Sequence, residues 1–162
     1  MTTLLLAVTL LLSIVGVAPG PSSVEPQIAG SPLQTAEITV GGVPLTVELA
    51  YLPADTSLGL GYREGLAPGT GMLFLFEGPA PRTFWMRGMQ FCIDIAWIEN
   101  GVIQGAAEGV CPEPAGTADA DLTSYVSPVP VTYVLEVPAG WLDAYGLGAG
   151  TPVEGLPSLV SQ

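Results

Sequence analysis

Two arginines, two aromatic residues and one aspartate form the group of side chains in this chain most suited to binding chemistry. In sequence order they are Arg82, Phe84, Trp85, Arg87 and Asp94. A guanidinium group presents a fork of N–H donors that matches a carboxylate, and it also stacks on aromatic rings. A third arginine, Arg63, completes the cations of a chain without lysine. The grouping predicts a binding site for a carboxylate or another small anion.

Asp94 allows two further interpretations because it stands in an apolar run. A buried carboxylate without a partner would cost several kcal/mol. We therefore expect Asp94 to pair with Arg87 or Arg63, or with backbone N–H groups of a neighbouring loop. Such a pair would fix the loop geometry without binding a ligand, and this is the interpretation we favour. Alternatively, Asp94 acts as a general acid or base together with Glu64.

The composition excludes several classes of function. Fifteen acidic residues against three arginines give a net charge of −12. This charge opposes binding to nucleic acid or to anionic lipid, because both need a field of basic residues. The chain has no histidine, so Ser–His and Cys–His nucleophile pairs and histidine-bound metals are excluded. We expect no cofactor and no metal site.

The first 36 residues differ in composition from the rest of the chain. Residues 4–17 are apolar apart from Thr9 and Ser13, a length that suits a secretory signal and is short for a membrane span of about 20 residues. We predict a signal peptide or N-terminal anchor over residues 1–20, a linker rich in Pro, Ser and Gly over 21–36, and a tail over 156–162. Either form of the first segment places the domain outside the cytoplasm, secreted or anchored to the outer face of the membrane.

Residues 37–155 show many short strand patterns separated by turns. Strands are predicted at 38–40, 43–49, 72–76, 83–86, 93–98, 102–107 and 129–137, and short helices at 55–61 and 141–145. Gly41-Gly42 and Asn100-Gly101 are typical of hairpin turns. The continuous apolar run at 72–76 indicates a central strand. The pattern predicts a compact, barrel-like single domain that is mainly β with short helices (α+β).

The two cysteines, Cys92 and Cys111, lie on either side of the second of these hairpin turns. If Ile98 pairs with Val102 or Ile103, continued antiparallel pairing brings the cysteines opposite each other, allowing for a bulge. An exported chain with an even number of cysteines favours a disulfide. Two free, buried thiols are the alternative.

Several short motifs occur in an order that resembles a known family. They are Leu58–Leu66, Gly71–Phe76, Phe84–Met89, Asp94–Ile98, Tyr125–Pro128, Tyr133–Gly140 and Gly146–Val153. This order is similar to the domain-of-unknown-function family one-nine-two, whose small domains are often exported. The resemblance covers about residues 37–155 and implies a small, mainly-β barrel-like fold. It implies no reaction, because the family has no assigned biochemical role.

The chain departs from the family pattern at three places. Arg87-Gly88-Met89 stands where relatives usually have Lys-Asn-Thr. Cys92-Ile93-Asp94 replaces Pro-Leu-Asp, and Thr151-Pro152 replaces a frequent Gly-Asp. We expect a non-enzymatic binding domain whose partner is a small anionic ligand or an envelope component. A His-free hydrolase that uses carboxylates and a purely structural envelope module are the alternatives.

Overall fold

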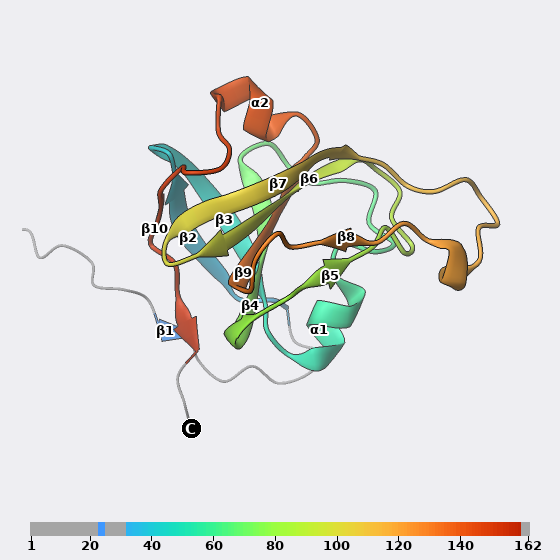
Figure 1. Cartoon of the computed structure of the whole chain (residues 1–162), viewed down its shortest axis with the longest axis horizontal. Coiled ribbons are helices and arrows are strands. Elements are labelled where there is room, and N and C mark those ends of the chain that lie inside the picture. Colours follow the sequence, from blue (N-terminus) through green and yellow to red (C-terminus); the bar gives the residue numbers. More distant parts are fainter. Residues whose placement is uncertain (1–22, 25–31, 160–162) are drawn as a thin grey trace, which may run out of the picture.

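The computed structural model describes residues 23–24 and 32–159. Its centre is a seven-stranded sheet in the order β10-β2-β3-β4-β9-β6-β7 (Figure 1). The strands are β2 (Thr35–Val40), β3 (Val43–Ala50), β4 (Thr70–Ala80), β6 (Ile93–Glu99), β7 (Val102–Val110), β9 (Val131–Pro138) and β10 (Val153–Glu154). The apolar segment predicted over residues 1–20 and most of the predicted linker lie outside the described residues.

The sheet curls until its two ends meet. β10 pairs with β2, and the segment that leads into β10 also bonds to the start of β7. Val102 and Pro152 form an antiparallel bridge there, and the Ile103 N–H donates to the Thr151 carbonyl at 2.9 Å. Closure of this kind satisfies backbone groups that an open edge would leave unpaired. The predicted fold class, a compact barrel-like domain that is mainly β with short helices, is confirmed.

β3 and β4 are the parallel neighbours in this sheet, so the chain must cross over between them. The crossover contains α1 (Pro53–Leu58), with Gly59 at its C-terminal end at φ 52°. The sequence predicted a helix over 55–61, and the structure moves it toward the N-terminus. Proline suits the first turn of a helix because its missing N–H needs no partner there.

The central strands β4, β9 and β6 are buried on both faces, which divides the apolar core into two clusters. Side chains alternate between the two faces of a strand, so β4 sends Leu73 and Leu75 into the barrel and Met72 and Phe74 outward. The inner cluster includes Val47, Leu73, Leu75, Ala96, Ile98, Leu135 and Val137. The outer cluster includes Leu60, Met72, Phe74, Met86, Ile95, Trp97 and Val134.

Short elements cover the outer cluster and one end of the barrel (Figure 1). The outer side carries α1 and the pair of β5 (Thr83–Phe84) with β8 (Tyr125–Val126). The 3-10 turn η1 (Asp119–Asp121) lies in the loop before β8. α2 (Trp141–Tyr145) inserts Leu142 into the inner cluster and ends at left-handed Gly146, as predicted. β1 (Ser23–Val24) and β11 (Ser158–Leu159) form a separate parallel pair.

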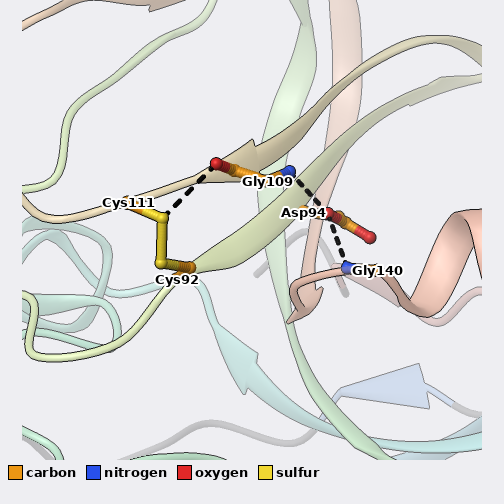
Figure 2. The surroundings of a disulfide bond; sticks show 5 residues. All are labelled: Cys92, Asp94, Gly109, Cys111 and Gly140. Atoms are coloured by element: carbon orange, nitrogen blue, oxygen red, sulfur yellow. Dashed lines mark hydrogen bonds between the residues drawn. A yellow bond between two sulfur atoms is a disulfide. The ribbon is translucent and has the colours of Figure 1, made fainter.

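The β6–β7 hairpin carries the disulfide. Asn100 and Gly101 form its turn with φ of 52° and 70°, the left-handed values that a tight hairpin requires. Two register shifts along the ladder bring Ile93 opposite Val110. Cys92 and Cys111 follow directly and are bonded (Figure 2), which confirms the predicted bridge. Such bonds persist in oxidising compartments. Within the described residues, none of the helices has the length and apolar character needed to cross a membrane.

Candidate functional site

A pocket of about 270 Å³ opens on the outer face of the sheet next to α1. Three stretches of chain build its walls, and β9 adds one residue, Glu136. The first stretch is Thr56–Gly61, which includes the end of α1. The second is Phe74 with Phe76 on β4, and the third is Pro81–Trp85 with Arg87 and Met89 around β5. The pocket therefore forms where the crossover connection and the segment after β4 fold back over the same face of the sheet.

Aromatic side chains give the pocket a rigid apolar wall. Phe74 and Phe84 pack edge to face with their ring centroids 4.9 Å apart, the arrangement that aromatic quadrupoles favour. Trp85 and Leu58 line the same pocket, and they are 51% and 56% exposed. Large apolar groups left in contact with solvent beside a pocket are common at ligand-binding sites.

Arg82 is a fixed cation in the wall of this pocket. Its Nη2 donates to the Gly78 carbonyl at 2.7 Å, and its Nε donates to the Val131 carbonyl at 3.4 Å. The guanidinium carbon lies 3.8 Å from the centre of the Phe76 ring, a cation–π contact. Burial lowers the pKa of Arg82, but an arginine remains charged at neutral pH. These contacts hold the charge in place before any ligand arrives.

Arg87 is the more exposed of the two arginines that line the pocket. Its side chain is 56% exposed, and its Nη2 lies 2.8 Å from Oδ2 of Asp119, which is 65% exposed. An exposed ion pair of this kind contributes little to stability. Arg87 can therefore exchange Asp119 for a ligand at low cost.

Arg63 lies next to the pocket and is occupied by an acidic partner. Its two terminal nitrogens donate to both oxygens of Glu48 at 2.9 and 2.7 Å. This side-chain hydrogen bonding raises the pKa of Arg63, against the opposing effect of burial. Of the predicted site residues, Arg82, Trp85 and Arg87 line the pocket together. Arg63 is not among the residues that line it.

Glu136 is the acidic side chain among the pocket-lining residues. It is 5% exposed, and it shares the outer face with Met72, its neighbour across the β4–β9 ladder. Its Oε2 is buried and has no hydrogen-bond partner within the described residues. Burial raises the pKa of Glu136 to about 8, and the charge of Arg63 opposes this rise. At neutral pH the group is therefore mostly an uncharged acid.

Asp94 lies away from the pocket, at the end of the barrel closed by α2. The expected pairing with Arg87 or Arg63 is wrong, because those arginines bond Asp119 and Glu48.

The partners of Asp94 are backbone N–H groups, the other possibility that the sequence left open. Gly109 and Gly140 donate to Oδ1 at 2.8 and 3.1 Å, and Leu142 donates to Oδ2 at 3.1 Å. Figure 2 shows Asp94 on β6 between Gly109 on β7 and Gly140 before α2. The carboxylate fixes these segments to one another.

Glu136 was missing from the site predicted by the sequence, although a signal was present. It is a single acidic residue in the otherwise apolar run Val134–Val137, as Asp94 is in β6, the neighbouring strand of the sheet. The argument that a buried carboxylate needs a partner applies equally to both positions. The three-dimensional structure distinguishes the two residues. Asp94 accepts hydrogen bonds from three N–H donors, whereas Glu136 has an unpaired oxygen and lines a pocket.

Two of the residues that depart from the family pattern line the pocket, namely Arg87 and Met89. Gly88 between them has φ of 69°, and a Cβ atom there would lie 2.8 Å from the ring of Tyr62. The Tyr62 N–H also donates to the Gly88 carbonyl at 2.8 Å. The glycine therefore lets the segment around residue 88 pack against the turn after α1.

The barrel with its outer pocket defines a small, mainly β domain, and comparison with known proteins gives its family. The profile of the domain-of-unknown-function family DUF192, described as an uncharacterised ACR, matches residues 36–155. The chain belongs to this family. None of the curated proteins compared with it matches significantly.

Two solved structures have the same fold. A proposed transcription regulator from Sinorhizobium meliloti 1021 is 31% identical, with a TM-score of 0.70 over 79% of this chain and 100% of the other. A protein of unknown function from Novosphingobium aromaticivorans DSM 12444 is 28% identical, with a TM-score of 0.67 over 86% of this chain and 99% of the other.

Proposed function

We propose that this protein is a non-enzymatic, extracytoplasmic binding domain that takes a small organic anion in its outer pocket. The observation that carries the proposal is the presence of Arg82 and Arg87 in one pocket beside Trp85. These are two of the three cations in a chain of net charge −12. A positive site in so acidic a molecule favours a negatively charged group because the surrounding field repels anions everywhere else.

The dimensions of the pocket limit the size of this ligand. Its volume of about 270 Å³ lies just below the range of roughly 300–1,000 Å³ that is usual for drug-sized ligands. A single ring with its substituents would fill it, whereas a folded partner would not enter. An envelope component would therefore be bound through one protruding group.

The arrangement of Arg82 and Arg87 supports the binding of a carboxylate. Arg82 is held by two carbonyl groups and a ring, so little conformational freedom is lost when a ligand meets it. Arg87 is exposed and bound only at one nitrogen by Asp119 in the described structure. Its remaining donors are available to close over the ligand.

Two other assignments have less support. A hydrolase of the usual two-carboxylate kind needs a second acid facing the first. Among the described residues that line this pocket, Glu136 is the only acid. Regulation of transcription, proposed for the Sinorhizobium protein, would require a basic surface for nucleic acid. The net charge of −12 makes such a basic surface unfavourable in this chain.

The proposed location outside the cytoplasm is supported by the Cys92–Cys111 bond and by the apolar run at residues 4–17. N-terminal sequencing of the exported protein would test it. A mature N-terminus between residues 18 and 36 is expected for a secreted form, and an intact N-terminus for an anchored form. Recovery of the protein in the cytoplasm with both cysteines reduced would contradict the proposal.

A thermal-shift screen of small carboxylates against the full chain tests the binding function. Arg87→Ala should remove the shift given by any carboxylate that raises the melting temperature. Asp119→Asn is the matched control, because it releases Arg87 from its ion pair and should leave the shift equal or larger. If no carboxylate raises the melting temperature, or if Arg87→Ala keeps the full shift, the proposed function is wrong.

A further inference from the structure

Glu136 is not explained by an anion-binding pocket. An acidic group in a site for anions is unfavourable unless it has a task of its own, because its charged form repels the ligand. A buried polar atom without a partner is also rare in folded proteins and costs free energy. Oε2 of Glu136 is such an atom, and the side chain lines the pocket. Because the side chain lines the pocket, a ligand bound there can supply a hydrogen-bond partner to the carboxyl group.

We infer that the carboxyl group of Glu136 hydrogen-bonds a hydroxyl group of the ligand, and that the pocket is therefore a site for an acidic monosaccharide. This inference rests on the proposed function, since it assigns the second contact of the same ligand. The first contact is the carboxylate of the sugar acid with Arg87 and Arg82 at the rim. The second lies deeper, at the sheet.

The charges around Glu136 favour a neutral hydroxyl over a cationic group. Arg63 acts on Glu136 through its charge, and Arg82 and Arg87 line the pocket with it. Three guanidinium groups would repel an ammonium group at this position. Arg63 is paired with Glu48, and Arg87 is paired with Asp119. Each pairing neutralises the positive charge only in part, because the two charges of a pair are separated in space.

The protonation state of Glu136 suits a hydroxyl group. As an uncharged acid it offers one O–H donor and retains acceptor capacity, which matches a hydroxyl that both accepts and donates. The raised pKa of about 8 keeps this form dominant at neutral pH. Ionisation above that pH removes the donor and places a negative charge beside the anion.

The remaining walls fit the shape of a sugar ring. A pyranose has a face of C–H groups and an edge of hydroxyls. The exposed ring of Trp85, 51% exposed, offers a flat apolar surface for the C–H face. Ser57 and Thr83 line the same pocket, and their hydroxyls suit the edge. A ring acid without hydroxyls would meet the tryptophan and the arginines but would leave Glu136 unpaired.

Three ligands separate the contributions in titrations of the full chain. D-glucuronate has the ring, the carboxylate and the hydroxyls; cyclohexanecarboxylate lacks the hydroxyls; D-glucose lacks the carboxylate. We expect D-glucuronate to bind about tenfold or more tightly than either of the others, since a hydrogen bond with a buried partner is worth about this factor. Glu136→Leu should bring D-glucuronate down to the level of cyclohexanecarboxylate.

Glu136→Gln keeps the size and the hydrogen-bonding capacity of the side chain but does not ionise. We expect it to retain the preference for D-glucuronate and to lose its pH dependence. In the unmodified protein the affinity should fall as pH rises through about 8. The signal of the Trp85 indole N–H, identified with Trp85→Phe, reports by NMR that binding occurs in this pocket.

The outcomes distinguish the two proposals. If neither anion binds, the proposed function fails and the inference fails with it. If both anions bind equally tightly, or if Glu136→Leu leaves their ratio unchanged, the anion site stands and the role of Glu136 is wrong. Binding of D-glucose as tight as that of D-glucuronate would overturn the assignment to an acidic sugar.

Discussion

Asp94 and Glu136 are the two buried acidic residues of the described structure, and they lie on opposite faces of one sheet. On the β6–β9 ladder Asp94 faces Val137 and Ile95 faces Glu136, so the acids are one step apart along the strands. Because side chains alternate, Asp94 points to the end of the barrel closed by α2 and Glu136 points to the outer pocket. The first has three N–H donors, whereas the second has an unpaired oxygen.

This relationship predicts that Asp94→Ala mainly affects stability. Removal of the carboxylate leaves the N–H groups of Gly109, Gly140 and Leu142 without their partner. We expect the free energy of unfolding to fall by about 3–5 kcal/mol, because hydrogen bonds to charged groups are worth about 1.5–3 kcal/mol each and neighbouring losses are not additive. Urea unfolding followed by far-UV circular dichroism measures the change.

Two further variants complete that experiment. Asp94→Asn keeps one acceptor oxygen and should lose less than Asp94→Ala. Asp121→Ala, an exposed aspartate in η1, should change the free energy of unfolding by no more than about 0.5 kcal/mol. An Asp94→Ala protein as stable as the unmodified chain would show that the three hydrogen bonds contribute nothing.

Glu136→Gln should change how stability depends on pH. The folded protein holds the pKa of Glu136 at about 8, above its ordinary value of 4.5. A carboxyl group with a raised pKa favours folding in its protonated form, so stability is highest below the unfolded value and falls as pH rises toward 8. Glutamine has no such term. We expect the variant to match the unmodified protein near pH 4 and to exceed it by a few kcal/mol at pH 9.

Unfolding in urea at pH 4, 6, 8 and 9 measures this dependence. Glu64→Gln is the control, because it removes one negative charge from an exposed position and leaves Glu136 in place. Its stability should fall with pH in parallel with that of the unmodified protein. Parallel curves for Glu136→Gln and the unmodified protein would mean that Glu136 ionises as freely in the fold as in the unfolded chain.

Local sequence rules predicted the hairpins and the disulfide because short-range chemistry decides them. The left-handed residues Asn100 and Gly101 fix the turn, and the register from there leads to the Cys92–Cys111 bond, apart from two bulges. The central strands β4 and β6 were likewise predicted, because each contains a continuous apolar run of strand length. These features need no knowledge of distant parts of the chain.

The site was harder to predict because long-range packing decides it. Whether Asp94 meets an arginine or backbone N–H groups depends on where the segment before α2 returns, 46 positions away at Gly140. Glu136 lines a pocket because the crossover with α1 and the segment around β5 lie over the same face of the sheet. No spacing in the sequence indicates that two such connections enclose a pocket.

Arg63 is predicted to control the ionisation of Glu136. Its charge lowers the pKa of Glu136 against the effect of burial, so Arg63→Met should move that pKa upward from about 8. Loss of the partly exposed pair with Glu48 should itself cost no more than about 1 kcal/mol. A titration of the Glu136 carboxyl carbon by NMR measures the shift.

The matched control for that titration is Glu48→Gln. It breaks the same ion pair but retains the guanidinium group, so the pKa of Glu136 should not rise. A rise of equal size in both variants would trace the effect to loosened packing around β3 instead of the charge of Arg63.

The disulfide is predicted to stabilise the domain through the loop that it closes. Cys92 and Cys111 are 19 residues apart, and a loop of this length corresponds to about 3 kcal/mol in the chain-entropy model. The double variant Cys92→Ser with Cys111→Ser should lose about this free energy of unfolding, and reduction of the unmodified protein should cause a similar loss. Because the bond lies at the open end of the β6–β7 hairpin next to Gly109, a donor to Asp94 (Figure 2), part of the loss should disappear in the Asp94→Ala background. Losses that add in full would mean that the two features stabilise the domain independently.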